Sequence, residues 1–518
     1  MTPHDGAYVT EPDLSAYPPP EPGKELQRDA EWQRLDPRML FVHPIREVIR
    51  FLPVLIVFAV ARTAAGGEPW QLLGVAIPVA LGLLRYLTTR FRIAAGRIEL
   101  QRGLLNRHVL STPVDRVRTV DLTSSPIHRL LGLTTLKIGT GTASTSDEDR
   151  IDLDGLPLDR ARALREQLLR TSTADDAIEE SPDREVVTFA LSWLRFAPLT
   201  GSGVVIAAAA LGAASQLLQA TGFFERFNPE TVRLPGLSLV VLVPLLVAAA
   251  LAVVSLLAIG GYLVTNWGFR LTRTRGSGTW HLTRGLFTTR ETTLDDERVA
   301  GVNVSEPLGL RAARGARLSA IVTGLDRKQQ GSSALVPPGP LAVVERVARE
   351  VLDTAEPVDT PLVGHGPHAV RRRWTRALAP AGVVAAGGVL AVALGEPTWL
   401  LAGLVTLPVA ALLAWDRTRS LGHALVAGHL VARSGSVVRR RRILEADHVI
   451  GWNFQATWFQ RRAGLTTLVA TTAGGNQAVA VLDVPEGEAV RVAQAALPHL
   501  IGEFVELGDF PAQSAARA

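Results

Sequence analysis

The stretch VDRVRTVDLTSSPIHRLLGLTTL, residues 114–136, carries the pattern that decides the fold. Its last five residues, GLTTL, occur again at Gly464–Leu468, far along the chain. These five residues contain no titratable group, so a catalytic reason for their recurrence is weak. A duplicated structural unit explains the recurrence better.

Three stretches of the chain can be aligned around this phrase. They begin with GRIELQRG at residue 96, GTWHLTRG at residue 278 and GHLVARSG at residue 428. In each stretch a second glycine follows seven residues after the first, and a basic residue followed by valine stands thirteen residues further on. The positions of this repeat motif are Gly103, Arg116, Pro126, Arg129 and Gly132 in the first stretch, Gly285 and Arg298 in the second with Gly315 as its late glycine, and Gly435, His448 and Gly464 in the third. Matched spacings of this kind predict an internal repeat.

Each repeat has a readable local structure. The second glycine suits a tight hairpin turn, where a positive φ is cheap for glycine. The flanking stretches alternate loosely between apolar and polar residues and favour strands. SSPIHRLLG predicts a single helical turn that ends at Gly132. Amphipathic helices are expected at 158–170, 341–352 and 488–500, so each repeat predicts a small antiparallel barrel or sandwich capped by one helix.

The composition combines features of membrane proteins and soluble proteins. Mean hydropathy is +0.20 and hydrophobic residues make up 47% of the chain, yet charged residues still make up 20%. This mixture predicts membrane segments that alternate with soluble segments. The absence of cysteine excludes disulfides, thiolate metal sites and cysteine nucleophiles. The net charge of +5 fits a membrane protein that gathers arginine on its cytoplasmic side better than it fits a nucleic-acid-binding protein.

Apolar stretches that approach the width of a bilayer come in three pairs. We predict transmembrane helical hairpins at residues 46–88, 197–265 and 376–415. Arginines interrupt the first pair, so a shallow re-entrant hairpin is the alternative there. Basic residues are scarce in the loops within the pairs and frequent at their other ends, which the positive-inside rule assigns to the cytoplasm. Both termini and all soluble parts are therefore predicted to be cytoplasmic, at the cell membrane.

The predicted organisation follows from these hairpins. We predict a mixed fold class of membrane α-helices and soluble β-sheets. Each helical hairpin precedes one small antiparallel β-barrel capped by a C-terminal helix. A disordered tail is expected at 1–40 and a linker at 355–374. The soluble parts, called the first, second and third segments below, are expected at 89–172, 267–354 and 418–506.

Residues 114–144 resemble the second family of bacterial pleckstrin-homology-like domains. The pattern of that family is an Arg-Ile/Val pair in a strand, a short helix reading Pro-hydrophobic-x-Arg-hydrophobic-hydrophobic-Gly, and a further strand. Pro126, Arg129 and Gly132 match it, whereas the third segment lacks the proline and the second replaces the helix end with LRAARGARL. The resemblance implies a seven-stranded antiparallel barrel capped by a C-terminal helix, with no catalytic residues and no common substrate.

Four consecutive arginines, Arg439, Arg440, Arg441 and Arg442, follow the Gly435 turn. In pleckstrin-homology folds the first hairpin often binds lipid phosphates, and each arginine near an anionic membrane gains about 1 kcal/mol. Strand geometry would place two of the four side chains on each face. The alternative interpretation is a solvated, positively charged edge strand that resists aggregation.

Aromatic residues interleave with arginines in the third segment. They are Trp452, Phe454, Trp458 and Phe459, beside Arg461 and Arg462. We interpret the aromatic residues as part of the core of that segment. Docking at a membrane interface is the alternative, and stacking on nucleic acid bases is not favoured.

Other candidate motifs lack the spacing that their chemistry needs. The acidic stretch SDEDRIDLDG at 146–155 does not have the ligand order of a calcium loop. GTGTAST at 139–145 lacks the Lys-Ser/Thr ending of a phosphate loop, and the eleven histidines form no HExxH pair. We therefore predict no catalytic site, no metal and no cofactor.

These observations favour a non-catalytic membrane protein that presents three pleckstrin-homology-like segments for binding. Tandem weak modules on one anchor act through effective concentration. Membrane lipids and an unidentified protein are the expected partners, a homo-oligomer stays open, and nucleic acid is not expected. A transporter or permease component is the alternative, although the four cleaner apolar stretches carry no charge at their centres.

Overall fold

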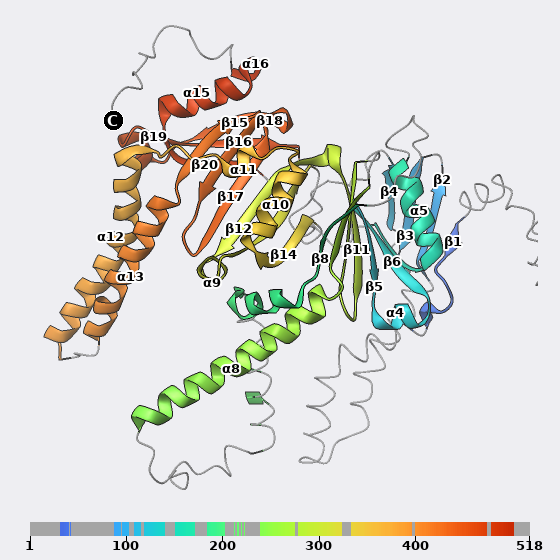
Figure 1. Cartoon of the computed structure of the whole chain (residues 1–518), viewed down its shortest axis with the longest axis horizontal. Helices are drawn as coiled ribbons and strands as arrows, with labels where there is room; N and C mark the ends of the chain where they lie inside the picture. The colour runs from blue at the N-terminus through green and yellow to red at the C-terminus, as the bar shows by residue number, and fades with distance from the viewer. Residues whose placement is uncertain are drawn as a thin grey trace, which may run out of the picture.

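The computed structural model describes a large part of the chain. The described residues are 32–40, 42, 88–94, 96–102, 108–114, 119–139, 151–170, 184–201, 212, 215, 216, 219, 222, 239–274, 278–323, 333–395, 399–473 and 478–501. Figure 1 shows β-sheets that run across the molecule, with long helices projecting from one side of them. The predicted hairpin at 46–88 lies almost wholly outside the described residues, as does most of the apolar stretch at 201–220.

The first segment consists of two antiparallel sheets packed on one core. Its first strands are β2 (Arg90–Ala94), β3 (Arg97–Arg102) and β4 (His108–Pro113). Its later elements are β5 (Thr119–Ser124), α4 (Pro126–Leu130), β6 (Leu133–Gly139), β7 (Ile151–Pro157) and α5 (Leu158–Arg170). Ile98, Leu136 and Leu153 are fully buried between the sheets and pack with Leu164 of α5. Alternating burial along a strand is what a sheet with one core face requires.

The second segment shows the same succession of elements. It begins with β9 (Arg270–Thr274), β10 (Thr279–Arg284), β11 (Thr289–Asp295) and the 3-10 turn η6 (Asp296–Arg298). It continues with β12 (Val299–Pro307), α9 (Leu308–Ala312), β13 (Gly315–Val322), β14 (Ala334–Pro340) and α10 (Leu341–Val351). The elements ahead of it are β8 (Arg184–Thr188), the 3-10 helix η5 (Leu191–Leu199) and α8 (Leu239–Asn266).

The third segment has this succession as well, after α11 (Glu356–Asp359), α12 (Gly366–Ala393) and α13 (Leu400–Arg419). Its first part is β15 (Gly422–Val426), β16 (His429–Ser434), β17 (Val438–Glu445) and the 3-10 turn η9 (Ala446–His448). Its second part is β18 (Val449–Gln455), α14 (Trp458–Arg462), β19 (Leu465–Thr472), β20 (Val479–Pro485), α15 (Glu486–Ala496) and α16 (Pro498–Ile501).

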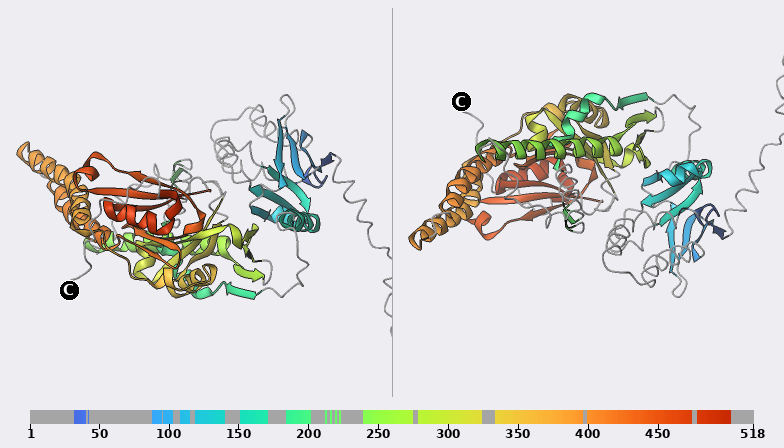
Figure 2. Two further views of the ribbon diagram at one scale, coloured as in Figure 1. Left: turned by 90° about the horizontal axis from the view of Figure 1, so that it is seen from above. Right: turned by 90° about the horizontal axis from the view of Figure 1, so that it is seen from below.

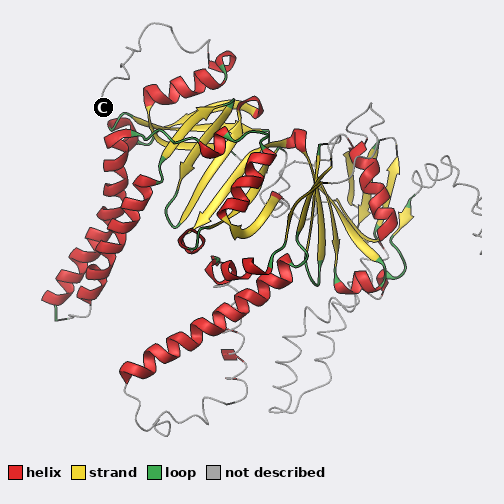
Figure 3. Cartoon of the chain, viewed as in Figure 1, coloured by secondary structure: helices red, strands yellow, loops and turns green. Residues whose placement is uncertain are grey.

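The sheets continue from one segment into the next (Figures 1 and 3). β5 of the first segment pairs with β11 of the second in a seven-stranded sheet of order β7-β6-β5-β11-β10-β9-β8. β12 of the second segment pairs with β17 of the third in a six-stranded sheet of order β14-β13-β12-β17-β16-β15. The prediction of separate closed barrels is therefore wrong. The sheets are open, because β5 and β12 pair with the following segment instead of closing their own.

Both junctions between segments have the same register. Val120 lies opposite Thr293 at the first junction, and Val302 lies opposite Ile443 at the second. Each valine stands four residues after the motif arginine, and each partner stands eight residues after the motif glycine. Two junctions built on identical positions indicate one recurring way of joining neighbouring segments.

A short strand that precedes each segment extends its first sheet. β1 (Gln33–Arg34) pairs with β2, β8 pairs with β9, and Val363 forms an isolated bridge to His423 in β15. Met39 is completely buried and lies against Gly155 of β7. The disordered tail predicted for 1–40 is therefore wrong over residues 33–40.

The motif glycines of the second and third segments lie in tight hairpin turns. The φ angles of Gly285 and Gly435 are +114° and +113°. A Cβ atom at either position would lie 2.0 Å from a backbone carbonyl oxygen, that of Thr288 or Val438. Only glycine fits such a turn. Gly103, their counterpart in the first segment, lies outside the described residues.

The spacing predicts Gly315 as the counterpart of Gly132 and Gly464 in the second segment, but the residue at that place in the structure is Arg314. Gly132 and Gly464 have φ angles of +69° and +62°, and the residue that adopts this conformation in the second segment is Arg314, at +54°. Gly315 begins β13 instead, where a Cβ would lie 2.6 Å from the ring of Phe196. LRAARGARL, residues 310–318, nevertheless supplies the end of the short helix α9 and the start of β13, so this segment departs from the sequence pattern without a change of local structure.

Replacing Arg314 by glycine is expected to raise the free energy of unfolding by about 1 kcal/mol. A non-glycine residue in the left-handed region costs about 1–2 kcal/mol, part of which the greater freedom of glycine in the unfolded chain offsets. Chemical denaturation of the purified variant measures the change. Gly464→Ala is the matched control and should lower stability by a similar amount. A destabilised Arg314→Gly variant would contradict this assignment.

Two helices in the described part of the chain are long and apolar enough to cross a membrane. They are Ala248–Asn266, within α8, and Gly366–Ala393. α13 packs along α12, where the Cα of Gly403 approaches Ala385 so closely that a Cβ would lie 2.8 Å from the Ala385 Cα. Close helix packing on small residues is typical of membrane helices. Figure 1 shows α8, α12 and α13 projecting to the same side of the sheets. Figure 2 shows the same helices from above and from below.

Candidate functional site

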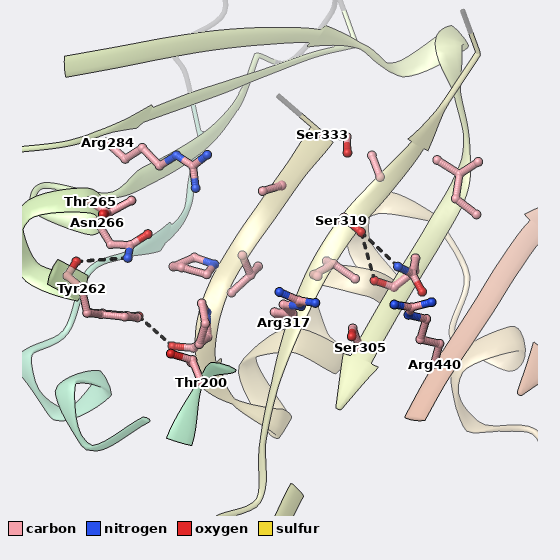
Figure 4. Close-up of a pocket in the computed structure, with 18 of the residues that line it drawn as sticks. Thr200, Tyr262, Thr265, Asn266, Arg284, Ser305, Arg317, Ser319, Ser333 and Arg440 are labelled. Atoms are coloured by element: carbon pink, nitrogen blue, oxygen red, sulfur yellow. Dashed lines mark hydrogen bonds between the residues drawn. The ribbon is translucent and has the colours of Figure 1, made fainter. Parts of the chain in front are cut away.

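A pocket of about 640 Å³ lies on one face of the six-stranded sheet, beside the C-terminal end of α8. Strands β12, β13, β14 and β17 supply its floor and walls, so residues of the second and third segments meet in it (Figure 4). Asn303 and Ser305 of β12 face the pocket, whereas Val302 and Val304, which alternate with them, belong to the core on the opposite face. The junction between two segments therefore creates the site.

The four consecutive arginines of β17 are divided between the two faces of this sheet. Arg440 and Arg442 line the pocket. Arg439 faces away and pairs with Asp416 of α13, with 3.1 Å between Nη2 and Oδ1. Arg441 donates to the backbone oxygens of Pro357 and Thr360 at 2.8 and 2.9 Å. Strand alternation thus leaves two of the four guanidinium groups for a ligand.

Two further arginines face the same space. Arg317 reaches the pocket from β13 and Arg284 from the end of β10 (Figure 4). The described lining residues include no aspartate and no glutamate. The charges of Arg317 and Arg442 interact with that of Arg440, whereas Arg284 has the carboxylate of Asp121 near it. Positive charge is therefore in excess around Arg440, and this favours binding of an anion.

The electrostatics of the pocket agree with this description. The pKa of Arg442 is lowered, first by burial and then by the neighbouring charge of Arg440. The same two causes lower the pKa of Arg317, although its side chain is exposed and solvent screens the effect. All these groups stay charged at neutral pH because arginine starts from such a high pKa. A bound anion would relieve the repulsion between them.

Polar groups near the arginines complete a hydrogen-bonding surface. Ser305 is 2% exposed, and its Oγ has no partner among the described residues. The Oδ1 of Asn303 is also without one, while its Nδ2 donates to Ser319 Oγ at 3.3 Å. A hydroxyl and guanidinium groups on one surface suit phosphate or carboxylate oxygens.

The end of α8 is fixed beside this surface. The Tyr262 hydroxyl donates to the carbonyl oxygen of Pro338 in β14 at 2.7 Å. The backbone amide of Gly285 donates to Trp267 at 2.9 Å, which holds the β10–β11 turn on the same helix end. The pocket therefore lies where the long apolar helix meets the sheets.

The aromatic residues of the third segment are mostly not core residues. Phe454, Trp458 and Phe459 are 42%, 53% and 70% exposed. Only Trp452 packs against the core of the third segment. The core interpretation is wrong for the other three, because β18 is an edge strand and α14 has open space on its outer side.

The remaining motif residues are structural. Pro126 begins α4, and the Nη1 of Arg129 donates to the carbonyl oxygen of Leu286 in the second segment at 3.0 Å. Arg298 is buried and lies 3.5 Å from Asp295. Arg116 lies outside the described residues, as do residues 146–150 of the acidic stretch 146–155. In the described ranges no cluster of three or more histidine, cysteine or acidic residues is arranged to hold a metal ion.

A buried histidine pair was not expected from the sequence. His365, in the predicted linker, is 4% exposed, and its Nε2 lies 3.0 Å from Nδ1 of His423. Its Nδ1 lies 2.8 Å from the carbonyl oxygen of Leu482. A carbonyl can only accept, so Nδ1 carries the proton and Nε2 accepts from His423. Burial, followed by the charge of His423, lowers the pKa of His365 to about 4.

Stability is expected to fall as the pH drops from about 6.5 toward 4. In the unfolded chain His365 takes up a proton near its ordinary pKa of 6.5, whereas in the folded chain it does so only near 4. The contribution is complete above pH 6.5 and lost as pH falls through 4, by up to about 3 kcal/mol. Denaturation midpoints at pH 7 and pH 4.5 measure it. The loss should shrink in His365→Gln, and an equal loss in both proteins would contradict this origin.

The sequence was compared with known proteins. The bacterial PH domain family matches residues 48–172 and residues 379–497. These two stretches contain the first segment and residues 418–497 of the third, with parts of the predicted hairpins before them, and the second segment is not in them. A search of the curated proteins finds no match to this chain.

Proposed function

We propose that all three segments are pleckstrin-homology-like units and that the chain is a non-catalytic, membrane-anchored binding protein. The family match to the first and third segments supports this, together with the common succession of elements in all three. The apolar helices α8 and α12 support the anchor. Three spanning hairpins, with both termini and all segments in the cytoplasm, belong to this proposal. So does the cell membrane as its location.

The ligand that the geometry favours is an anion bound by Arg317, Arg440 and Arg442. The observation that carries this is the pocket at the second junction, where these arginines converge without an acidic neighbour among the described lining residues. Its place beside the cytoplasmic end of α8 is within reach of phospholipid headgroups, so an anionic lipid is the expected source of the phosphate. A protein partner would then bind the same membrane-anchored scaffold elsewhere, through its sheet edges or exposed helices.

The double variant Arg440→Gln, Arg442→Gln is expected to bind anionic lipid about thirtyfold more weakly. Each arginine near an anionic headgroup contributes about 1 kcal/mol, and the two lost charges add. Binding of a short-chain phosphatidylglycerol to the full-length protein in mild detergent, followed by calorimetry, measures the change. Inorganic phosphate as a second probe distinguishes a lipid site from a site for free phosphate.

The matched control is Arg346→Gln, Arg461→Gln. It has the same change in net charge at two exposed positions outside the pocket. Unchanged lipid affinity in this control is expected. Equal weakening in both double variants would show that only overall charge matters and would remove the pocket from the proposal.

A further inference from the structure

Among the described residues, β4 and β18 each have one edge without a partner strand, and these two edges correspond to the two halves of the internal junctions. At the first junction β5 pairs with β11, and at the second β12 pairs with β17. In both cases the strand just before the short helix of one segment pairs with the third strand of the next segment. In the third segment the counterpart of β5 and β12 is β18, which lies at the edge of a three-stranded sheet. In the first segment the counterpart of β11 and β17 is β4, the outermost strand of its sheet.

In the described part of the chain, no residue covers the outer side of β18. Ala300 in β12 is completely buried, and Ile450 at the same place in β18 is 63% exposed. Val304 is 4% exposed, and its counterpart Phe454 is 42% exposed. Large apolar side chains on an open edge strand are a liability that proteins normally cover. β4 likewise exposes an apolar residue, since Val109 is 54% exposed.

We propose that β18 of one molecule pairs with β4 of a second copy of this chain, in the antiparallel register of the two internal junctions. Leu122 and Val304 stand six residues after the motif arginine, and they lie opposite Glu291 and Arg441, six residues after the motif glycine. The same counts give Phe454, six residues after His448, and Val109, six residues after Gly103. The repeated register therefore places the two exposed apolar residues opposite each other.

Contacts beside the strands support the same partner. At the first junction Arg129 of α4 donates to Leu286 in the next hairpin turn, and at the second the amide of Leu308, the first residue of α9, donates to Val437 at 2.7 Å. The third short helix, α14, exposes Trp458 and Phe459 on the corresponding side.

The orientation of the long helices agrees with such a contact. The second junction leaves α8 and the α12–α13 pair on one side of the sheets (Figure 1). A further junction of the same kind keeps the helices of the next molecule on that side, so one bilayer can hold both. The contact joins different surfaces of the two copies, and it therefore produces rings or open rows, not closed two-fold dimers.

Cysteine crosslinking tests the register directly, because the chain has no cysteine of its own. Two full-length chains with different tags, one with Val109→Cys and one with Phe454→Cys, are coexpressed and oxidised in the native membrane. A disulfide-linked pair of differently tagged chains is expected, since directly opposite Cβ atoms lie about 4.5–5.5 Å apart. Leu122→Cys with Glu291→Cys in one chain is the positive control. Ile450→Cys, exposed on the same strand but four residues out of register, should crosslink to Val109→Cys far less.

Blocking each edge separately tests the head-to-tail arrangement. Val109→Glu and Phe454→Glu lie at exposed positions, and unchanged unfolding midpoints would show that both variants fold. The wild-type protein in mild detergent is expected to be oligomeric by mass photometry, each variant alone monomeric, and their mixture dimeric and no larger, because only one intact pair of edges remains.

Three results would overturn this proposal. The first is a wild-type protein that is monomeric in detergent and gives no crosslink in the membrane. The second is a Val109→Glu variant that assembles as the wild type does, which would indicate contact of β18 with itself. The third is a β18 edge crosslinked only to a different protein or to the C-terminal residues of its own chain.

Discussion

The Asp483→Asn variant is expected to lose about 3–5 kcal/mol of the stability of the third segment, the largest effect of any single substitution considered. Asp483 is 1% exposed and forms ion pairs with Arg372 and Arg373. The Nε of Arg373 lies 2.7 Å from Oδ2 of Asp483. The Nε2 of Gln460 also donates to Asp483 at 2.8 Å. Asparagine removes the charge and leaves two largely buried guanidinium groups without a counterion.

This carboxylate joins three parts of the structure. The arginines belong to α12, Gln460 belongs to α14, and Asp483 itself lies in β20. Its φ angle is +54°, a conformation that costs a non-glycine residue about 1–2 kcal/mol and persists because these contacts hold it. The variant should therefore loosen the attachment of α12 to the third segment as well as lower the stability of that segment.

Thermal unfolding in detergent and limited proteolysis after α13 measure both effects. Asp447→Asn, an exposed aspartate of the same segment, is the matched control and should change neither. An Asp483→Asn protein with the wild-type melting temperature would show that the ion pairs are too well solvated to matter.

Gly301→Ala is expected to destabilise the protein by about 3 kcal/mol, through the second junction. The φ angle of Gly301 is +156°, and a Cβ atom there would lie 2.0 Å from the carbonyl oxygen of Ile443 in the paired strand β17. Either strain at this position or separation of the two strands must follow, and strain and overpacking each cost about 1–3 kcal/mol. The pocket should be disturbed with the junction, since Asn303 and Arg442 lie on these two strands.

Gly451→Ala is the matched control, at the same position of the edge strand β18. The nearest atom to a Cβ there is the Thr471 hydroxyl at 3.3 Å, so a monomer should tolerate the change with little loss. Denaturation curves of both variants, together with lipid binding for Gly301→Ala, make the comparison. Equal destabilisation by the two substitutions would contradict a special role for the junction.

The sequence predicted the local structure of each segment better than the connections between segments. Tight turns at Gly285 and Gly435, the short helix at Pro126 and the division of Arg439–Arg442 between two faces all follow from spacing and alternation. Alternation decides which face of a strand is buried, but it does not decide which neighbour the strand edge pairs with. The prediction of closed barrels was wrong for that reason.

The sequence likewise predicted only some of the residues of the candidate site. Two of its arginines lie in a conspicuous run, and alternation selects Arg440 and Arg442 from it. Arg317 and Arg284 stand alone on β13 and β10, and only the junction between segments brings Arg440 near Arg317. The burial of His365 was missed because Pro and Gly around it favour a linker, although the chain there bridges to β15.

The shared register of the two junctions has a consequence for how this chain can change in length. The second segment pairs with the first through β11 and with the third through β12. If this segment were removed, β5 could pair with β17 in the register that both strands already use. Whole segments can thus be lost or gained without a new interface. Three segments are one member of a series, and gene duplication alone could supply the others.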